Sequence, residues 1–184
     1  MANERKIDYV ILGLLCHEQL TGYEIKKLLD MRLKYFWGAS YGSIYPTLNT
    51  LVQNELVTKY ETTENGREKI IYTITDKGRD YLKEWMALPV TKDELRYETL
   101  LKLFFGAELG GEGTLKHIDA FEEKIKEELP ILHQMVGSLE AVKDEEEAHL
   151  YYLMTARFGE MVYETYVKWC KEVRKALAVK QSKM

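Results

Sequence analysis

The sequence predicts a mainly α-helical protein with one small β-hairpin. Three observations carry this prediction. Hydrophobic residues recur at helical spacing up to residue 53, and two runs rich in β-branched and aromatic residues then meet at Asn65-Gly66. After residue 90 the spacing is helical again. We therefore expect an N-terminal domain at residues 1–88 that contains the hairpin, and an all-helical domain at residues 89–184.

Composition limits what kind of protein this is. The net charge of −4 lies in the second half, since residues 1–86 hold 12 Lys/Arg and 12 Asp/Glu, whereas residues 87–184 hold 14 and 18. A neutral first half is compatible with a nucleic-acid partner bound through few phosphate contacts. Cys16 and Cys170 lack the spacing of a zinc site or a disulfide framework. With no apolar run of membrane length, we expect a soluble cytoplasmic protein.

The first two helices are predicted to form a scaffold. Residues 6–18 hold apolar residues spaced 3, 1, 3, 1, as in a helix packed into a core. The next helix opens with a capping box, in which Thr21 is the N-cap and Glu24 stands at the third helical position. Its apolar residues again lie on one face, and it ends near residues 36–38.

The stretch from Ser40 to Leu51 predicts the helix around which the N-terminal domain is organised. Its apolar residues recur at i, i+4 and i+7 and face a core, while the opposite face carries no charge. Small hydroxyls, amides and a glycine on such a face can lie close to phosphates and base edges. Ser40 or Ser43 could cap this helix, and Pro46 favours a start near Gly42 or Ser43, where free N–H groups suit a phosphate. The alternative is an ordinary buried helix with a polar outer face.

A β-hairpin follows this helix. Residues 56–62 and 68–74 are strand-like, and the Asn65-Gly66 that joins them is the strongest short hairpin signal. Three helices followed by a hairpin describe a winged helix-turn-helix, which places its recognition helix in the major groove of DNA. Arg67 and Lys69, beside the hairpin tip, could reach phosphates or a groove. The residues expected to lie against DNA are Ser40, Tyr41, Gly42, Ser43, Tyr45, Pro46, Asn49, Thr50, Arg67 and Lys69.

Several motifs occur in one order within residues 10–85, and they are Ile11-Leu12-Gly13-Leu14-Leu15, Thr21-Gly22-Tyr23-Glu24-Ile25, Phe36-Trp37, Ser40-Tyr41-Gly42-Ser43-Ile44-Tyr45-Pro46, Leu48, Leu51, Leu56-Val57, Gly66-Arg67, Tyr72, Ile74-Thr75, Gly78 and Trp85. Together these motifs resemble the DNA-binding domain of the PadR-like transcriptional regulators. The resemblance implies a dimeric winged helix regulator, usually a repressor, with Ser43, Tyr45 and the hairpin tip near DNA. The family's effectors, which include phenolic acids and other aromatic molecules, differ from member to member.

The chain departs from the family pattern after the recognition helix. The family often has an acidic residue where Val52 stands and a glycine where Glu55 stands. Such a glycine would take the left-handed conformation that closes a helix. Here we expect Asn54 to serve instead, because asparagine is the next most tolerant residue in that conformation.

The C-terminal half reads as helical throughout. A capping box at residues 91–94 opens one helix, which glycines between residues 106 and 113 should end. A helix at residues 114–143 should kink at Pro130, and a last helix runs to about Ala178. Helices of about 30 residues, near 45 Å long, need a partner, and a second copy of the chain is the simplest one. The residues expected at the dimer interface are Leu150, Met154, Phe158, Met161, Tyr166 and Trp169.

No enzyme chemistry is indicated. Three histidines of the C-terminal half lie 16 residues apart, and no phosphate-binding or nucleophile motif occurs, so we predict no catalytic residues, no metal and no cofactor. The 13 Tyr and three Trp could line a cavity for a small aromatic effector. The predicted function is that of a homodimeric regulator that binds operator sequences in double-stranded DNA. Because regulators of this family are usually repressors, we expect a repressor. The alternative is a helical interaction protein whose winged domain binds a protein partner and not DNA.

Overall fold

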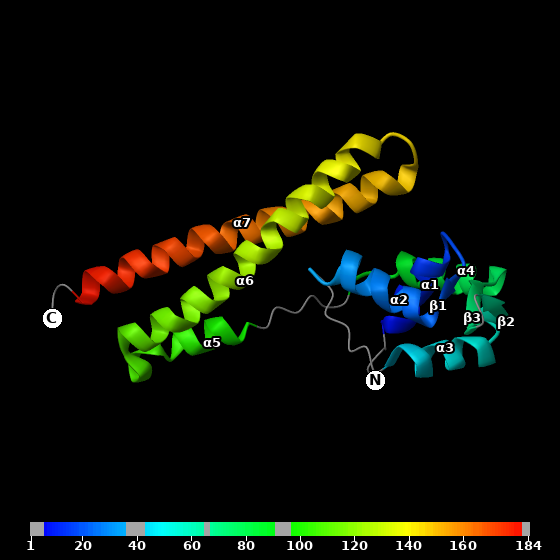
Figure 1. Cartoon of the computed structure of the whole chain (residues 1–184), viewed down its shortest axis with the longest axis horizontal. Helices are drawn as coiled ribbons and strands as arrows, with labels where there is room; N and C mark the ends of the chain where they lie inside the picture. Colours follow the sequence, from blue (N-terminus) through cyan, green and yellow to red (C-terminus); the bar gives the residue numbers. More distant parts are fainter. Residues whose placement is uncertain (1–5, 36–42, 65–66, 91–96, 182–184) are drawn as a thin grey trace. The chain divides into compact units, whose positions relative to one another are not determined.

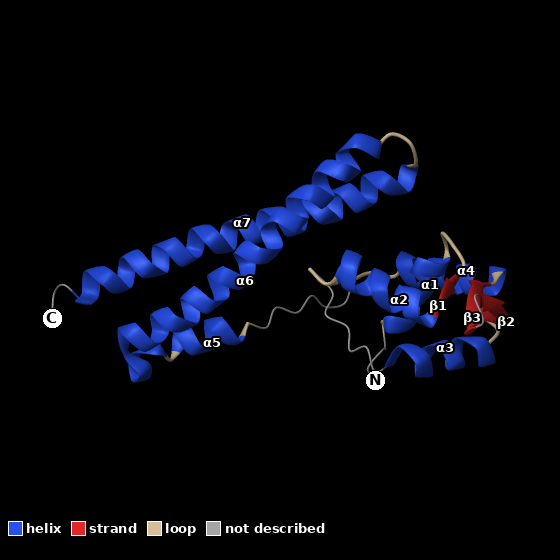
Figure 2. Cartoon of the chain, in the orientation of Figure 1, coloured by secondary structure: helices blue, strands red, loops and turns tan. Residues whose placement is uncertain are grey.

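The computed structural model describes residues 6–35, 43–64, 67–90 and 97–181 (Figure 1). The chain forms two compact units, Met1–Asp93 and Glu94–Met184. Both are dominated by helices, and the strands all belong to the first unit (Figure 2). The predicted class, mainly α with a winged helix-turn-helix followed by a helical region, is confirmed. Its elements in the first unit are α1 (Ile7–Leu15), β1 (Leu20–Thr21), α2 (Gly22–Leu28), a π-helical turn η1 (Leu29–Leu33), α3 (Ile44–Gln53), β2 (Val57–Glu64), β3 (Arg67–Ile74) and α4 (Asp76–Ala87).

Local caps define where two of these helices begin. The hydroxyl of Thr21 accepts a hydrogen bond from the Glu24 N–H at 3.2 Å, and the Glu24 carboxylate accepts one from the Thr21 N–H at 2.8 Å. This is the predicted capping box, and it starts α2. Thr75 caps α4 in the same way by accepting a hydrogen bond from the Gly78 N–H at 3.0 Å.

The sheet has three strands in the order β1-β3-β2, with both pairs antiparallel. The predicted hairpin supplies β2 and β3, in which Val57 lies opposite Ile74. Strand β1 was not predicted, because two residues carry no alternating pattern of their own. It pairs Leu20 with Tyr72 on β3 and so ties the hairpin to the start of α2.

One core holds the N-terminal unit together. It is built from apolar side chains of α1, α2, α3, α4 and all three strands, and it includes the fully buried Ile11, Leu12, Ile25 and Leu48. Helix α3 is the predicted recognition helix, and the β2–β3 hairpin is the wing. Because both pack on this core, the same side chains hold them in place.

The residue that closes α3 differs from the prediction. Glu55 takes the left-handed conformation, with φ 61°, while Asn54 has φ −84°. The N–H of Leu56 donates to the Leu51 carbonyl at 2.9 Å and that of Glu55 donates to Val52 at 3.0 Å, which is the Schellman pattern. The expectation that Asn54 would take this role is wrong. The end of the ten-residue helix determines which residue must adopt the left-handed conformation. Position 55, where the family often has glycine, therefore adopts it although glutamate stands there in this chain.

Every regular element of the C-terminal unit is a helix in the residues described. Its elements are α5 (Glu98–Phe104), α6 (Gly106–Val142) and α7 (Glu147–Gln181), and α6 and α7 pack along each other. The predicted end of a helix at the glycines from residue 106 onward is confirmed, since α5 ends at Phe104. Helix α6 already begins at Gly106, earlier than the expected residue 114, and it is kinked at Gly110, whose angles are non-helical with φ 80°. The backbone stays helical through Pro130. The capping box expected at residues 91–94 lies outside the described residues.

Candidate nucleic-acid interface

Helix α3 has the two faces that its sequence predicts. Ile44, Leu48 and Leu51 are buried, each at most 1% exposed. Thr47 is buried as well, which the spacing did not predict. The outward face carries exposed side chains and no charge, and its members are Tyr45, Pro46, Asn49, Thr50 and Gln53. An uncharged polar face of this kind can enter a DNA groove without removing water from a charged side chain.

The start of α3 lies where the proline indicated. Ser43 is the N-cap residue, with φ −96° and ψ −8°, and its side chain makes no capping hydrogen bond to the helix. Pro46 is therefore the third helical residue. Because proline has no N–H, the amide donors that this first turn can offer to an anion come from Ile44 and Tyr45. The predicted contacts Ser40, Tyr41 and Gly42 lie outside the described residues.

The two polar residues in the middle of α3 differ in what they can donate. The Thr50 hydroxyl donates to the Pro46 carbonyl at 3.1 Å, so its proton is used within the helix. Thr50 therefore presents a methyl group and an acceptor oxygen to a partner. The exposed Asn49 amide carries both a donor and an acceptor, the combination that pairs with adenine in the major groove.

Polar interactions link the wing, which is the β2–β3 hairpin, to the segment that runs from Gln19 into α2. The Tyr60 hydroxyl donates to the Gln19 side chain at 2.9 Å. The pKa of the Glu24 carboxyl is lowered, chiefly by its hydrogen bonds from Thr21 and further by the positive charge of Lys69. Lys69 is half-buried and its charge acts on Glu24 of α2, which sequence reasoning missed. The backbone of β3 begins at Arg67, whose side chain lies outside the described part of the structure.

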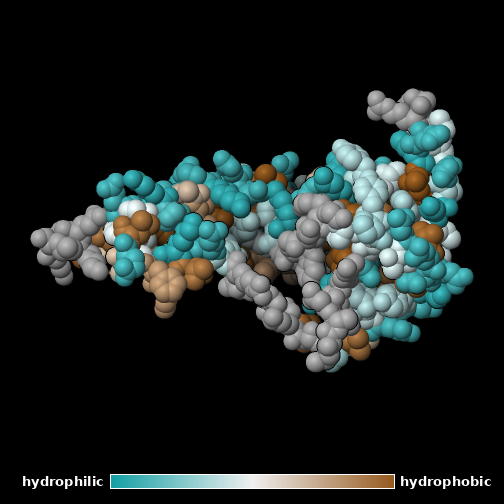
Figure 3. Space-filling model, turned by 90° about the horizontal axis from the view of Figure 1, so that it is seen from below, coloured by the Kyte–Doolittle hydropathy of each residue, from teal (hydrophilic) through white to brown (hydrophobic). Residues whose placement is uncertain are grey.

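A hydrophobic stripe runs along α7 in the second unit. We use this name for Leu150, Met154, Phe158 and Met161, which are 48%, 50%, 62% and 65% exposed. Their spacing of 4, 4 and 3 places them on one side of the helix, whereas Leu153, Ala156 and Cys170 face inward and are buried. Other hydrophobic side chains of this unit, outside the stripe, lie at the surface among hydrophilic ones in the left part of Figure 3, where α5 and the first turns of α6 lie. The stripe is on the outer side of the protomer and not on its inner face.

Tyr166 and Trp169, the other two predicted interface residues, lie in an aromatic cluster within the protomer. The Phe121 ring of α6 lies 5.5 Å from the Tyr166 ring and 6.0 Å from the Trp169 ring, between centroids. The Tyr166 hydroxyl is hydrogen-bonded to that of Tyr97, and burial together with this bond raises the pKa of the Tyr166 phenol. These two residues pack α7 on α6.

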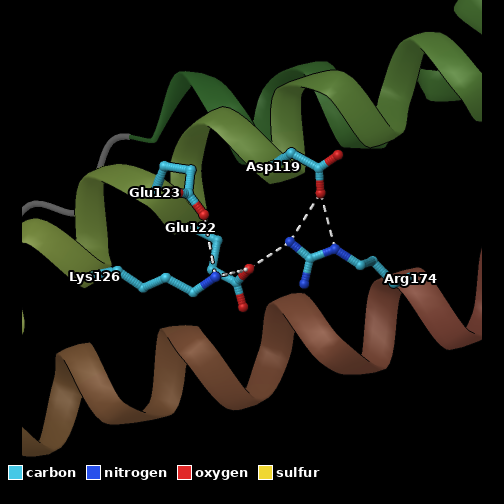
Figure 4. A network of polar contacts seen from close by, with 5 residues as sticks. All are labelled: Asp119, Glu122, Glu123, Lys126 and Arg174. Carbon is cyan, nitrogen blue, oxygen red and sulfur yellow. Dashed lines mark hydrogen bonds and ion pairs between the residues drawn. The ribbon is translucent and has the colours of Figure 1, made fainter.

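A charged network joins the same two helices (Figure 4). Arg174 of α7 donates from Nε to the Asp119 carboxylate at 2.8 Å and from an Nη nitrogen to the Glu122 carboxylate at 2.6 Å. Lys126 reaches Glu122 at 3.0 Å and Glu123 at 3.1 Å. The Glu122 side chain is 5% exposed. Its hydrogen bond from Arg174 lowers the pKa of the Glu122 carboxyl, although burial alone would raise it.

The described residues hold neither a metal site nor a membrane-spanning helix. No three His, Cys, Asp or Glu side chains there come together so that they could hold a metal ion. In the same residues no helix combines the length and the apolar character needed to cross a membrane.

Comparison with known proteins decides the family. Residues 11–84 match the model of the transcriptional regulator PadR-like family, and residues 95–178 match the virulence activator alpha C-terminal model. The negative transcriptional regulator PadR of Bacillus subtilis (strain 168) is 34% identical over 143 residues, which are 74% of each chain. This chain belongs to the PadR-like family of transcriptional regulators.

Two solved structures extend the likeness over nearly the whole chain. The smu.1604c protein of Streptococcus mutans UA159 has a TM-score of 0.78 and 31% identity, covering 90% of this chain and 96% of that one. Bacillus subtilis PadR in complex with operator DNA has a TM-score of 0.79 and 27% identity, covering 94% and 99%. The PadR-like fold of this chain therefore includes both its winged and its helical unit.

Proposed function

We propose that this protein is a homodimeric, sequence-specific DNA-binding regulator that represses transcription. The observation that carries the proposal is the uncharged, exposed face of α3 on a winged unit of the kind found in a PadR that was solved with operator DNA. The name of the Bacillus subtilis relative, a negative regulator, supports repression. We place its action in the cytoplasm, because DNA is the target and both cysteines are free. Release by a small aromatic effector stays a prediction from the family resemblance.

We propose two kinds of DNA contact for α3, one with bases and one with the DNA backbone. Asn49, in the middle of α3, is assigned to a base edge, whereas Ser43, Tyr45 and the N–H groups of the first turn are assigned to the backbone near the helix start. Ser40, Tyr41, Gly42, Pro46, Thr50, Arg67 and Lys69 complete the proposed contacts. Because the N-terminal half is neutral overall, we expect few ionic contacts with phosphates.

A salt titration tests this function. The probe is the DNA upstream of the protein's own gene, labelled and titrated with the full chain at several salt concentrations. DNA binding should weaken linearly in log salt, with a slope of about −0.9 for each phosphate neutralised. We expect a shallow slope, and a scrambled probe of the same length should bind more weakly. Absence of salt-sensitive binding to this DNA and to any fragment recovered by genomic selection would instead favour a winged domain that binds protein.

The hydrophobic stripe on α7 is the proposed dimer surface. Four large apolar side chains on one exposed side of a helix cost free energy in water, and a second copy that covers them removes that cost. In a two-fold dimer the same stripe is buried on both protomers. Tyr166 and Trp169 contribute indirectly, because they hold α7 against Phe121 of α6.

A charge placed in the stripe tests the dimer. Phe158→Glu should shift the chain from dimer to monomer in light scattering, since a carboxylate would otherwise be buried in the interface. Its far-ultraviolet circular dichroism should not change, because Phe158 is 62% exposed in the protomer. Lys171→Glu is the matched control, at an exposed position of α7 outside the stripe, and should stay dimeric. A dimer that survives Phe158→Glu would place the interface elsewhere.

A further inference from the structure

Gly22 and Tyr45 make an unusually close contact between two helices of the winged unit. Gly22 is the first residue of α2 and is buried, and Tyr45 is the second residue of α3. A Cβ added to Gly22 would lie 2.6 Å from ring carbon Cε1 of Tyr45 and 3.1 Å from Cζ. Real Cβ atoms essentially never approach so closely. The missing side chain of Gly22 therefore provides the space in which the Tyr45 ring lies.

Tyr45 also lies near Tyr72 of β3, and more than half of its side chain is exposed to solvent. Tyr72 of β3 is 4% exposed, and its phenol pKa is raised, first by burial and then by the neighbouring Tyr45. Strand β3 also pairs Tyr72 with Leu20 of β1, which leads directly into α2. One side of the Tyr45 ring thus lies against the start of α2, near enough to Tyr72 to act on its pKa, while 58% of the Tyr45 side chain remains exposed.

Three glycines of this unit differ in what an added methyl group would meet. At Gly13, within α1, it would meet nothing within 4 Å. At Gly78 it would meet the backbone carbonyl oxygen of Leu56 at 2.2 Å, and backbone cannot move without disturbing the fold. At Gly22 it would meet the far end of the Tyr45 side chain, which can swing into solvent by rotation about its own bonds. A methyl group at Gly22 should therefore displace the ring and leave the fold intact.

We propose that Gly22 is a positioning residue for DNA recognition, because it holds the Tyr45 phenol in one orientation at the start of the recognition helix. This inference rests on the proposed function. A phenol held in place can donate its O–H to a phosphate oxygen beside the N–H groups of the same helical turn. A side chain that is already ordered loses less entropy on binding, which corresponds to about a two- to tenfold gain in affinity.

The test is a double-mutant cycle on binding of the full chain to the operator fragment recovered by genomic selection. Gly22→Ala should weaken binding about two- to tenfold, with a melting temperature close to that of the wild type. Gly13→Ala should bind like the wild type. In a Tyr45→Ala background, adding Gly22→Ala should change nothing, because no ring is left to displace. Equal losses in the two backgrounds, or unchanged binding by the Gly22→Ala single variant, would overturn the proposal.

A second measurement separates this proposal from the proposed function. With 3-fluorotyrosine at position 45, the fluorine resonance of the DNA-free protein should move in the Gly22→Ala variant and stay in place in Gly13→Ala. A resonance that stays in place in both variants would show that Gly22 does not hold the ring. A resonance that moves, in a protein whose wild type binds no DNA, would instead overturn the proposed function and with it the role assigned to Gly22.

Discussion

Replacing Arg174 with methionine should destabilise the packing of α7 on α6 by an amount that the geometry allows us to estimate. The variant loses the hydrogen bond at 2.6 Å to Glu122, whose side chain is 5% exposed, and the one at 2.8 Å to Asp119, whose side chain is 57% exposed. A hydrogen bond to a buried charge contributes about 1.5–3 kcal/mol, and an ion pair with an exposed carboxylate at most about 1 kcal/mol. Lys126 still reaches Glu122, so we expect a total loss of about 2–3 kcal/mol.

Thermal denaturation followed by circular dichroism measures this loss. For a chain of this length, it should lower the melting temperature by roughly 5–10 °C. The protomer concentration must be fixed, because the melting temperature of a dimer depends on it. Asp119→Asn, which alters only the exposed partner, should lower the melting temperature far less. A double variant with methionine at both Glu122 and Arg174 should recover most of the loss, because no buried charge is then left without its main partner.

The same variant should change how stability depends on pH. In the wild type the pKa of Glu122 is below its ordinary value, so its contribution is present above the unfolded pKa of about 4.3 and is lost as pH falls through the lower folded pKa. In Arg174→Met the Glu122 pKa rises relative to the wild type, because its main donor is gone and burial remains. The difference between the two melting temperatures should therefore narrow from pH 7 to pH 3. A difference that is absent at pH 7, or that is the same at both pH values, would refute this account of the network.

Further predictions concern the winged unit. Glu55→Gly should raise the free energy of unfolding by up to about 1 kcal/mol, because glycine adopts the left-handed conformation without strain. Asn54→Gly should lower the free energy of unfolding, because Asn54 has a negative φ. Equal unfolding midpoints of the two variants in urea would contradict both expectations. Asn49→Ala should weaken operator binding about ten- to a hundredfold and relax the preference at one position of each half-site, as measured on a panel of single-base operator variants. Leu48→Ala should instead weaken binding together with a loss of roughly 2–5 kcal/mol of stability, because Leu48 is fully buried. Arg67→Ala should weaken binding to all sequences by the same factor, and a sequence-dependent loss would show base readout at the wing.

Local patterns in the sequence were enough to predict much of the winged unit. The spacing of Ile44, Leu48 and Leu51 depends only on the helical repeat, so it predicted which face of α3 is buried. The capping box involves only Thr21 and Glu24, which are three residues apart, and Asn65-Gly66 alone indicated the hairpin. Both signals could be read from the sequence because each involves only neighbouring residues. The family resemblance rested on these local motifs and is confirmed. The DNA contacts assigned to individual residues remain predictions.

Tertiary structure decided the features that depend on residues far apart in the chain. Strand β1 exists because Leu20 finds a partner 52 positions later at Tyr72, and two residues alone carry no strand signal. The pairing of Glu122 with Arg174 spans the same separation and turns two ordinary surface-type residues into a network between helices. Hydrophobic periodicity on α7 could not distinguish a stripe that faces α6 from one that faces outward, because both repeat with the helix. Only the packing of α6 on α7 shows that Leu153 lies inside and Phe158 outside, since burial is a property of the neighbours and not of the residue.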